Sequence, residues 1–105
     1  MGYRVKLHPN VYQDLTGIIE DEAYEEVKGY LRTLESNPYF GQVLENRPDL
    51  GIDLQGFRKI YVFNKKYRIV YKINDNGFIE VYVIAIGERD KLKVYEEAYQ
   101  RTWER

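Results

Sequence analysis

The sequence contains no cysteine and only one histidine among its 105 residues. The absence of cysteine excludes disulfides, thiolate catalysis and cysteine-based zinc sites. With a single imidazole, a metal site built from several histidines is excluded as well. His8 is followed by Pro9 and is therefore interpreted as a residue at the entry of a helix.

Long apolar runs are also missing. No run approaches the ~20 residues that a membrane-spanning helix requires. The N-terminal segment MGYRVKLHPN lacks the apolar core of a signal peptide. We therefore expect a cytoplasmic protein with no membrane partner. The length predicts one domain over residues 1–105, and 44% hydrophobic with 31% charged residues is typical of a globular chain.

Charge is distributed unevenly along the chain, although the net charge is only −1. Residues 1–56 carry 10 acidic and 5 basic side chains, whereas residues 57–105 carry 7 acidic and 11 basic ones. The segment FNKKYRIVYKI contributes four of these cations and no acidic residue. Because local potential attracts a polyanion, a basic surface in the C-terminal half is the feature to explain.

Hydrophobic periodicity indicates a mixed α and β fold. The alternating segment YRVKL (3–7) predicts a strand. Val11, Leu15, Ile18 and Ile19 follow a helical spacing, and a second amphipathic helix ends at Asn37-Pro38. A connecting loop is expected at 38–55. Three strands follow at 56–63, 66–74 and 78–86, and a final helix at 88–105.

Two short turns join the last three strands, and the NDNG turn at 74–77 is a strong hairpin signal. The predicted order is β-α-α-β-β-β-α. It corresponds to an α+β fold in which a small antiparallel sheet packs against an N-terminal αα-hairpin and a C-terminal helix. The strand at 80–86 is nearly all apolar and is expected to be central.

Strand alternation predicts which side chains share a face of the sheet. The face opposite Ile60 and Ile69 is expected to carry Lys59, Tyr61, Arg68 and Lys72. Further cations lie in the first hairpin turn and after the last strand, namely Lys65, Lys66, Arg89, Lys91 and Lys93. A basic groove with aromatic rings is typical of a nucleic-acid-binding surface. On spacing alone, an ordinary solvated sheet face remains the simpler interpretation.

The segments LQGFRKIYVFNKKYRIVYKI and IEVYVIAIGERDKLKVYEEAYQR, together with YRVKLHPNVYQDL near the N-terminus, resemble the RelE/ParE toxin superfamily. RelE-like members are ribosome-dependent endoribonucleases that cut messenger RNA, whereas ParE-like members poison DNA gyrase. The resemblance implies a type II toxin whose partners are a cognate antitoxin, messenger RNA and the ribosome. DNA gyrase is the alternative target, and an inactive family member that acts as a binding module is a third possibility.

The RelE-like motif places the catalytic residues of this chain at Lys59, Arg68, Arg89 and Tyr95. Arg68 and Arg89 are candidates to stabilise the negative charge of the phosphorane. Lys59 is the candidate general base or a phosphate contact, and Tyr95 orients or stacks the nucleotide or transfers a proton. The implied chemistry needs no metal or cofactor, because the 2′-hydroxyl supplies the nucleophile. The basic groove adds Tyr61, Lys65, Lys66, Lys72, Lys91 and Lys93 as candidates for RNA contact.

Each of these residues also has a purely structural interpretation. Tyr95 lies on an apolar helical stripe with Leu92, Tyr99 and Trp103, which favours core packing. Arg89 has acidic neighbours that it can neutralise, and Lys59 is compatible with an ordinary exposed strand position. Tyr61 occupies the place where the family can carry a second lysine, so the assignment of proton transfer stays open.

Overall fold

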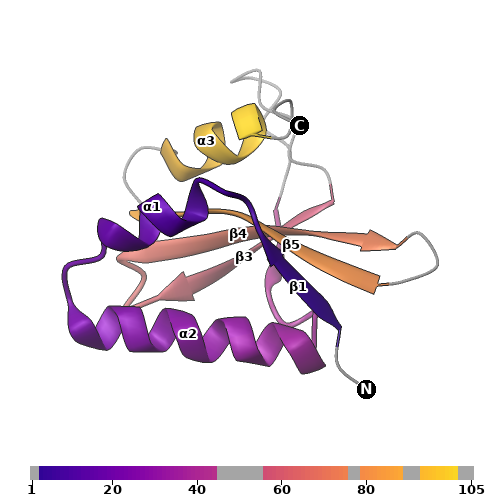
Figure 1. The fold of residues 1–105 in the computed structure, drawn as a ribbon, viewed down its shortest axis with the longest axis horizontal. Helices are drawn as coiled ribbons and strands as arrows, with labels where there is room; N and C mark the ends of the chain where they lie inside the picture. Colours follow the sequence, from indigo (N-terminus) through magenta and orange to yellow (C-terminus); the bar gives the residue numbers. More distant parts are fainter. Residues whose placement is uncertain (1–2, 45–55, 76–78, 89–92, 102–105) are drawn as a thin grey trace.

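The computed structural model describes residues 3–44, 56–75, 79–88 and 93–101. The elements in chain order are β1 (Arg4–Leu7), α1 (Val11–Thr16), α2 (Asp21–Ser36), β2 (Gln42–Val43), β3 (Phe57–Val62), β4 (Tyr67–Asp75), β5 (Ile79–Glu88) and α3 (Lys93–Arg101). This is the predicted order with one added short strand. Figure 1 shows a sheet between α2 on one side and α3 on the other.

The strands form one sheet in the order β1-β5-β4-β3-β2. β3, β4 and β5 make the predicted antiparallel meander, and β5 is internal, as its apolar sequence predicted. One pair departs from the expected antiparallel arrangement, because β1 runs parallel to β5. Parallel pairing requires a long crossover connection, and α1, α2 and the meander provide it. The sheet is therefore mixed.

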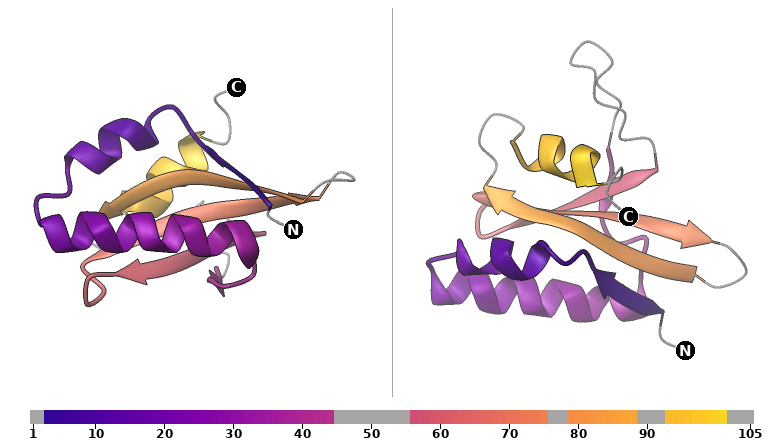
Figure 2. Two further views of the ribbon diagram at one scale, coloured as in Figure 1. Left: turned by 60° about the horizontal axis from the view of Figure 1, so that its bottom comes forward. Right: turned by 45° about the horizontal axis from the view of Figure 1, so that its top comes forward.

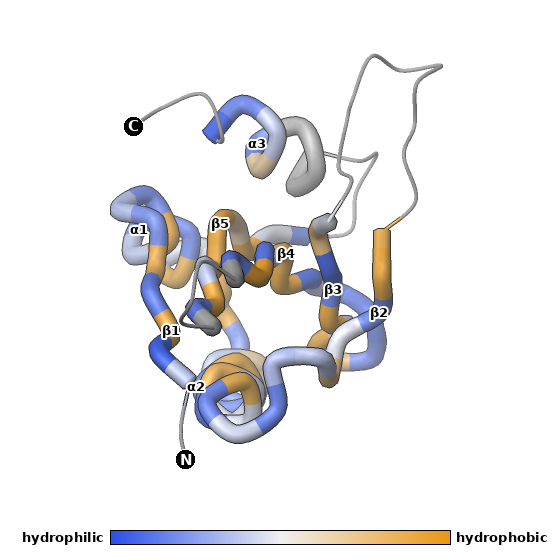
Figure 3. Tube along the Cα trace, turned by 90° about the vertical axis from the view of Figure 1, so that its right-hand side faces the viewer, coloured by the Kyte–Doolittle hydropathy of each residue, from blue (hydrophilic) through white to orange (hydrophobic). Residues whose placement is uncertain are grey.

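The sheet separates two hydrophobic cores, as the tube in Figure 3 illustrates. The larger core lies beneath α1 and α2 and includes Val27, Ile60 and Ile69, as strand alternation predicted. The smaller core lies beneath α3 and includes Val70, Ile84 and Ala98. α3 therefore covers part of the face on which the cations were expected. Figure 2 shows α3 over β4 and β5, with β3 further from it.

Two local predictions require correction. The first helix ends at Thr16 and is capped at Gly17, so the expectation that Ile19 extends its apolar face is wrong; Ile19 is 80% exposed. Within the predicted loop at 38–55, Gln42 and Val43 pair with Lys59 and Arg58 as strand β2. Among the described residues, no helix is long and apolar enough to cross a membrane.

Candidate functional site

Three cationic side chains converge on the ring of Tyr61 on β3. Lys59 Nζ lies 4.9 Å from the ring centre, Lys65 Nζ 5.3 Å and Arg68 Cζ 4.9 Å. Sheet pairing accounts for this arrangement, because Arg68 is directly opposite Tyr61, and Lys59 is two residues away on the same face. We call Lys59, Tyr61, Lys65 and Arg68 the Tyr61 cluster.

The members of the Tyr61 cluster differ in exposure. Arg68 is only 9% exposed, with its Nη2 at 3.5 Å from the Tyr61 hydroxyl, whereas Lys65 is exposed and Lys59 partly so. Within the described part of the chain, neither lysine forms an ion pair. A cation over an aromatic face gains roughly 0.5–1 kcal/mol at an exposed site, and the uncharged ring leaves the positive charge of the cation in place. The cluster is therefore a centre of positive potential around an aromatic ring, with Lys65 as its most exposed member.

The hairpin turn places Lys65 against Tyr61 by an unusual backbone conformation. Phe63, Asn64 and Lys65 have φ values of 53°, 53° and 67°. Positive φ at consecutive non-glycine residues is uncommon, although a turn of this hand matches the twist of the two strands. From α2, the Glu26 carboxylate accepts a hydrogen bond from the Phe63 N–H at 3.1 Å. The acidic helix layer thus supports the turn that presents the lysine.

The structure places two other predicted cations away from the Tyr61 cluster. Lys66 forms an ion pair with Glu20, which raises the pKa of Lys66 and lowers that of Glu20. Lys72 lies over the ring of Phe57, 5.6 Å from its centre. It is on the same face as Arg68 but four residues further along β4, roughly 13 Å away. Lys72 can therefore extend a basic track but does not belong to the cluster.

The remaining predicted residues follow β5. Arg89 and Lys91 lie outside the described residues. Lys93 and Tyr95 lie in the first turn of α3, and their side chains are likewise outside the described part. Their contribution to the site stays a prediction.

One residue that shapes the site was not predicted. Tyr71 is fully buried, and its hydroxyl donates to the Pro38 carbonyl at 2.8 Å and accepts from the Gly41 N–H at 2.9 Å. This contact holds the start of β2 against β3 beside Lys59, with which Gln42 pairs. Burial raises the pKa of Tyr71. The only signal in the sequence was the high frequency of tyrosine, at 11 residues.

A cavity of about 500 Å³ lies at the end of α1 and β5 rather than at the cluster. Asp14, Glu88 and Glu97 line it, so its potential disfavours a phosphate. No group of three histidine or carboxylate side chains arranged to hold a metal occurs within the described ranges. The cation and aromatic arrangement at Tyr61 is therefore the candidate site.

Comparison with protein families gives the decisive result. Residues 5–92 match the model of the ParE toxin of the type II toxin–antitoxin system parDE. The chain belongs to the ParE toxin family. Its membership of the RelE/ParE superfamily confirms the resemblance noted in the sequence. None of the curated proteins is similar enough in sequence to match this ParE-family toxin.

Solved structures share the fold of this ParE-family toxin. A double arginine-to-alanine mutant of E. coli toxin RelE in the free state is 24% identical, with a TM-score of 0.73 over 96% of this chain and 98% of that one. The toxin–antitoxin complex RelBE2 of Mycobacterium tuberculosis includes a chain that is 20% identical, with a TM-score of 0.65 over 85% and 100%. The YoeB/ParE toxin from Agrobacterium tumefaciens is 15% identical, with a TM-score of 0.63 over 82% and 98%.

Proposed function

We propose that this toxin cleaves messenger RNA on the ribosome, with the Tyr61 cluster as one wall of its RNA site. The observation that carries the proposal is the convergence of Lys59, Lys65 and Arg68 on one aromatic ring. Neither lysine has a carboxylate partner among the described residues. A phosphate oxygen can pair with such cations, and a base can stack on the accessible part of the Tyr61 ring, which is partly exposed.

In the proposed reaction the 2′-oxygen attacks the adjacent phosphorus and the bond from phosphorus to the 5′-oxygen breaks. The products are a 2′,3′-cyclic phosphate and a 5′-hydroxyl. Lys59 accepts the 2′-proton as a neutral amine or contacts the phosphate as a cation, and Arg68, with Arg89 as its predicted partner, stabilises the extra charge of the transition state. Tyr95 remains the candidate donor to the 5′-oxygen or nucleotide-stacking residue.

In this function the toxin is held inactive by a cognate antitoxin. The fold relatives from Mycobacterium tuberculosis and E. coli include toxin–antitoxin complexes, which supports a partner of that kind. The antitoxin would prevent cleavage by covering the Tyr61 cluster or by distorting it.

The test is controlled expression followed by mapping of new messenger RNA 5′ ends, for the native toxin and for Lys59→Ala and Arg68→Ala. Arg68 is nearly buried, so the more exposed Lys59 provides a variant with less effect on folding. Lys28→Ala on the exposed face of α2 is the matched control. The proposal is supported if the native toxin produces cuts within reading frames that are absent with Lys59→Ala and Arg68→Ala. The same cuts should persist with Lys28→Ala. Removing one transition-state donor typically lowers the rate by about 100-fold or more.

Inhibition of DNA gyrase is the second candidate. Two observations favour it: the matching family model is that of ParE toxins, and Tyr61 stands where the RelE-like pattern can carry a second lysine. Growth arrest without new RNA ends, together with loss of supercoiling by purified gyrase, would replace the nuclease proposal with this one. If expression causes no growth arrest and no RNA cleavage, the result favours an inactive binding module.

A further inference from the structure

β5 extends beyond the end of β1, its neighbour at one edge. β1 ends at Leu7, which pairs with Val83, and the His8 N–H donates to the Val83 carbonyl at 2.8 Å. β5 continues to Glu88, and no strand among the described residues pairs with this part of its edge. Backbone groups left without partners at such an edge are costly when buried. The chain must satisfy them in another way.

Two side chains from distant helices take that role. The Asp14 carboxylate on α1 accepts a hydrogen bond from the Ile86 N–H at 3.0 Å. Arg101 on α3 donates to the Ile84 carbonyl at 2.8 Å. In effect, Asp14 and Arg101 continue the ladder where β1 stops.

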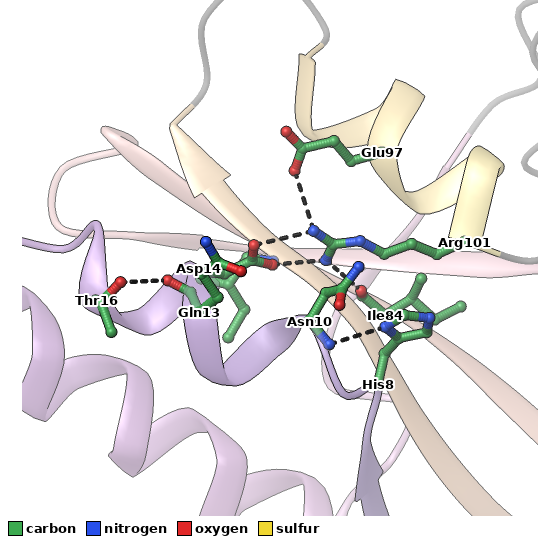
Figure 4. A network of polar contacts seen from close by, with 9 residues as sticks. His8, Asn10, Gln13, Asp14, Thr16, Ile84, Glu97 and Arg101 are labelled. Carbon is green, nitrogen blue, oxygen red and sulfur yellow. Dashed lines mark hydrogen bonds and ion pairs between the residues drawn. The ribbon is translucent and has the colours of Figure 1, made fainter. Parts of the chain in front are cut away.

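The same two side chains also bind each other. Arg101 Nη1 lies 2.7 Å from Asp14 Oδ2, and Nη2 lies 3.0 Å from Asp14 Oδ1, a bidentate pair (Figure 4). Their side chains are only 10% and 11% exposed. Glu97 adds a longer contact to Arg101 at 3.5 Å from the preceding helical turn. We call Asp14, Arg101 and the two β5 backbone groups the α1–α3 latch.

Apolar packing adds to this attachment of α3 in the described part of the chain. Ala98 is fully buried and Tyr99 partly buried against a core that includes Val70. A methyl group fills space but resists sliding and rotation poorly, whereas a bidentate arginine pair fixes orientation. Ala98 shares its core with Val70, whose partner across the sheet is Lys59. The position of α3 is therefore coupled to the strand positions that carry the Tyr61 cluster.

We propose that Asp14 and Arg101 are positioning residues for the toxin's proposed RNA site. The α1–α3 latch fixes α3 against β5, and α3 in turn fixes the packing of Val70 beside Lys59 and Arg68. The same helix carries Tyr95 in its first turn. The inference rests on the proposed function for its effect on cleavage. Its effect on α3 and on the Tyr61 cluster is independent of it.

The test compares Asp14→Asn, Arg101→Lys and the double exchange D14R/R101D in the full chain. Asn keeps the size of Asp but loses its charge, and Lys keeps the charge of Arg but loses its fork. The double exchange restores opposite charges while leaving the Ile84 carbonyl without its donor and the Ile86 N–H without its acceptor. Glu80→Gln, which removes the exposed Lys6–Glu80 pair between β1 and β5, is the matched control.

Amide hydrogen exchange at Ile86 and along residues 97–101 gives the first measurement. We expect protection to fall on the order of 100-fold in both single variants. Asp14→Asn leaves the nearly buried Arg101 charge without its partner, and Arg101→Lys loses the two-point fork that bonds both Asp14 and the Ile84 carbonyl. The double exchange is expected to stay unprotected, and Glu80→Gln to match the native protein. Native exchange in all latch variants would overturn the inference, as would full recovery in D14R/R101D.

The second measurement is RNA cleavage under saturating and limiting substrate. We expect kcat to fall at least about tenfold with little change in KM, because Lys59 and Lys65 still bind phosphate while the transition-state geometry is lost. A loosened α3 with unchanged kcat would overturn the positioning role and leave the nuclease proposal standing. If the native protein cleaves no RNA, the nuclease proposal fails. NMR then tests the positioning role without cleavage. The Val70 methyl and Arg68 guanidinium resonances should shift in the latch variants if the α1–α3 latch positions the Tyr61 cluster, and unchanged resonances would overturn the inference.

Discussion

The Gly41 N–H donates a hydrogen bond of 2.9 Å to the hydroxyl oxygen of Tyr71, which lies 30 residues later in the chain. A Cβ atom at position 41 would lie 2.7 Å from that oxygen and 2.7 Å from the Lys59 carbonyl oxygen. The backbone can therefore approach β3 this closely only because residue 41 is glycine. A buried phenol and an absent side chain together hold β2 beside the Tyr61 cluster.

Replacing Tyr71 by Phe is expected to destabilise the fold by about 1–3 kcal/mol, because the buried Gly41 N–H loses its acceptor and the Pro38 carbonyl its donor. Urea unfolding measures the change. Tyr39→Phe is the matched control, since Tyr39 is 52% exposed. Equal stability of the two variants would show that the tether is dispensable.

The same hydroxyl predicts an alkaline pH dependence. Desolvation raises the pKa of Tyr71 above its ordinary value of 10.0. A folded-state pKa above the unfolded one stabilises the fold fully below pH 10.0, and this contribution is lost as the pH rises through the folded value. The stability difference between native protein and Tyr71→Phe is expected to shrink above pH 10.0 in urea unfolding. A stability difference between the native protein and Tyr71→Phe that stays constant with pH would contradict this prediction.

Glu20 predicts the opposite dependence at acid pH. Hydrogen bonds from Lys66 and then Tyr67 lower the pKa of Glu20 below its ordinary value of 4.5. Its contribution is therefore present above pH 4.5 and lost as the pH falls through the folded value. Thermal unfolding of Glu20→Gln should show a lower midpoint than the native protein at neutral pH and the same midpoint in acid. Glu25→Gln, in an exposed pair with Lys28, provides the comparison.

Replacing Lys65 by Gly is expected to affect stability and RNA binding in opposite directions. Its φ of 67° is strained for a side-chain-bearing residue, so Lys65→Gly is expected to stabilise the fold by about 1 kcal/mol. The same change removes a cation from the Tyr61 cluster and should weaken RNA binding. Urea unfolding and RNA titration measure the two effects. Unchanged RNA affinity would remove Lys65 from the site.

Salt dependence tests the proposed phosphate contacts directly. Each phosphate neutralised on single-stranded RNA contributes roughly −0.7 to the slope of log affinity against log salt concentration. Lys59→Ala and Lys65→Ala should each reduce the steepness of the slope by about that amount. Lys28→Ala on the acidic helix should leave it unchanged. Equal slopes for all three variants would indicate that the lysines do not contact phosphate.

Local patterns were enough to predict the meander, the internal position of β5 and the face shared by Lys59, Tyr61 and Arg68. These features follow from period-two alternation and short turns, which act over neighbouring residues. The pairing of Tyr61 with Arg68 confirmed that the two side chains meet. The length of α1 was overestimated because Ile18 and Ile19 match a helical spacing although Gly17 ends the helix.

Other features depend on contacts that no local pattern records. β2 is two residues long and too short for a recognisable period. The Asp14–Arg101 pair joins residues 87 apart, and either residue alone resembles an ordinary surface charge on a helix. The β-bulge between Val70 and Tyr71 arises from the register of β4 on β5, which only the assembled sheet determines.

The pairing of β1 with β5 has a consequence for folding during synthesis. Arg4 pairs with Glu80 and Leu7 with Val83, so β1 pairs with the strand of this sheet that is translated latest. Until β5 emerges from the ribosome, the nascent chain lacks the strand on which β1, β4 and α3 all converge. Translation that stops before β5 therefore yields no folded toxin. The topology makes folding of the toxin domain conditional on synthesis through β5.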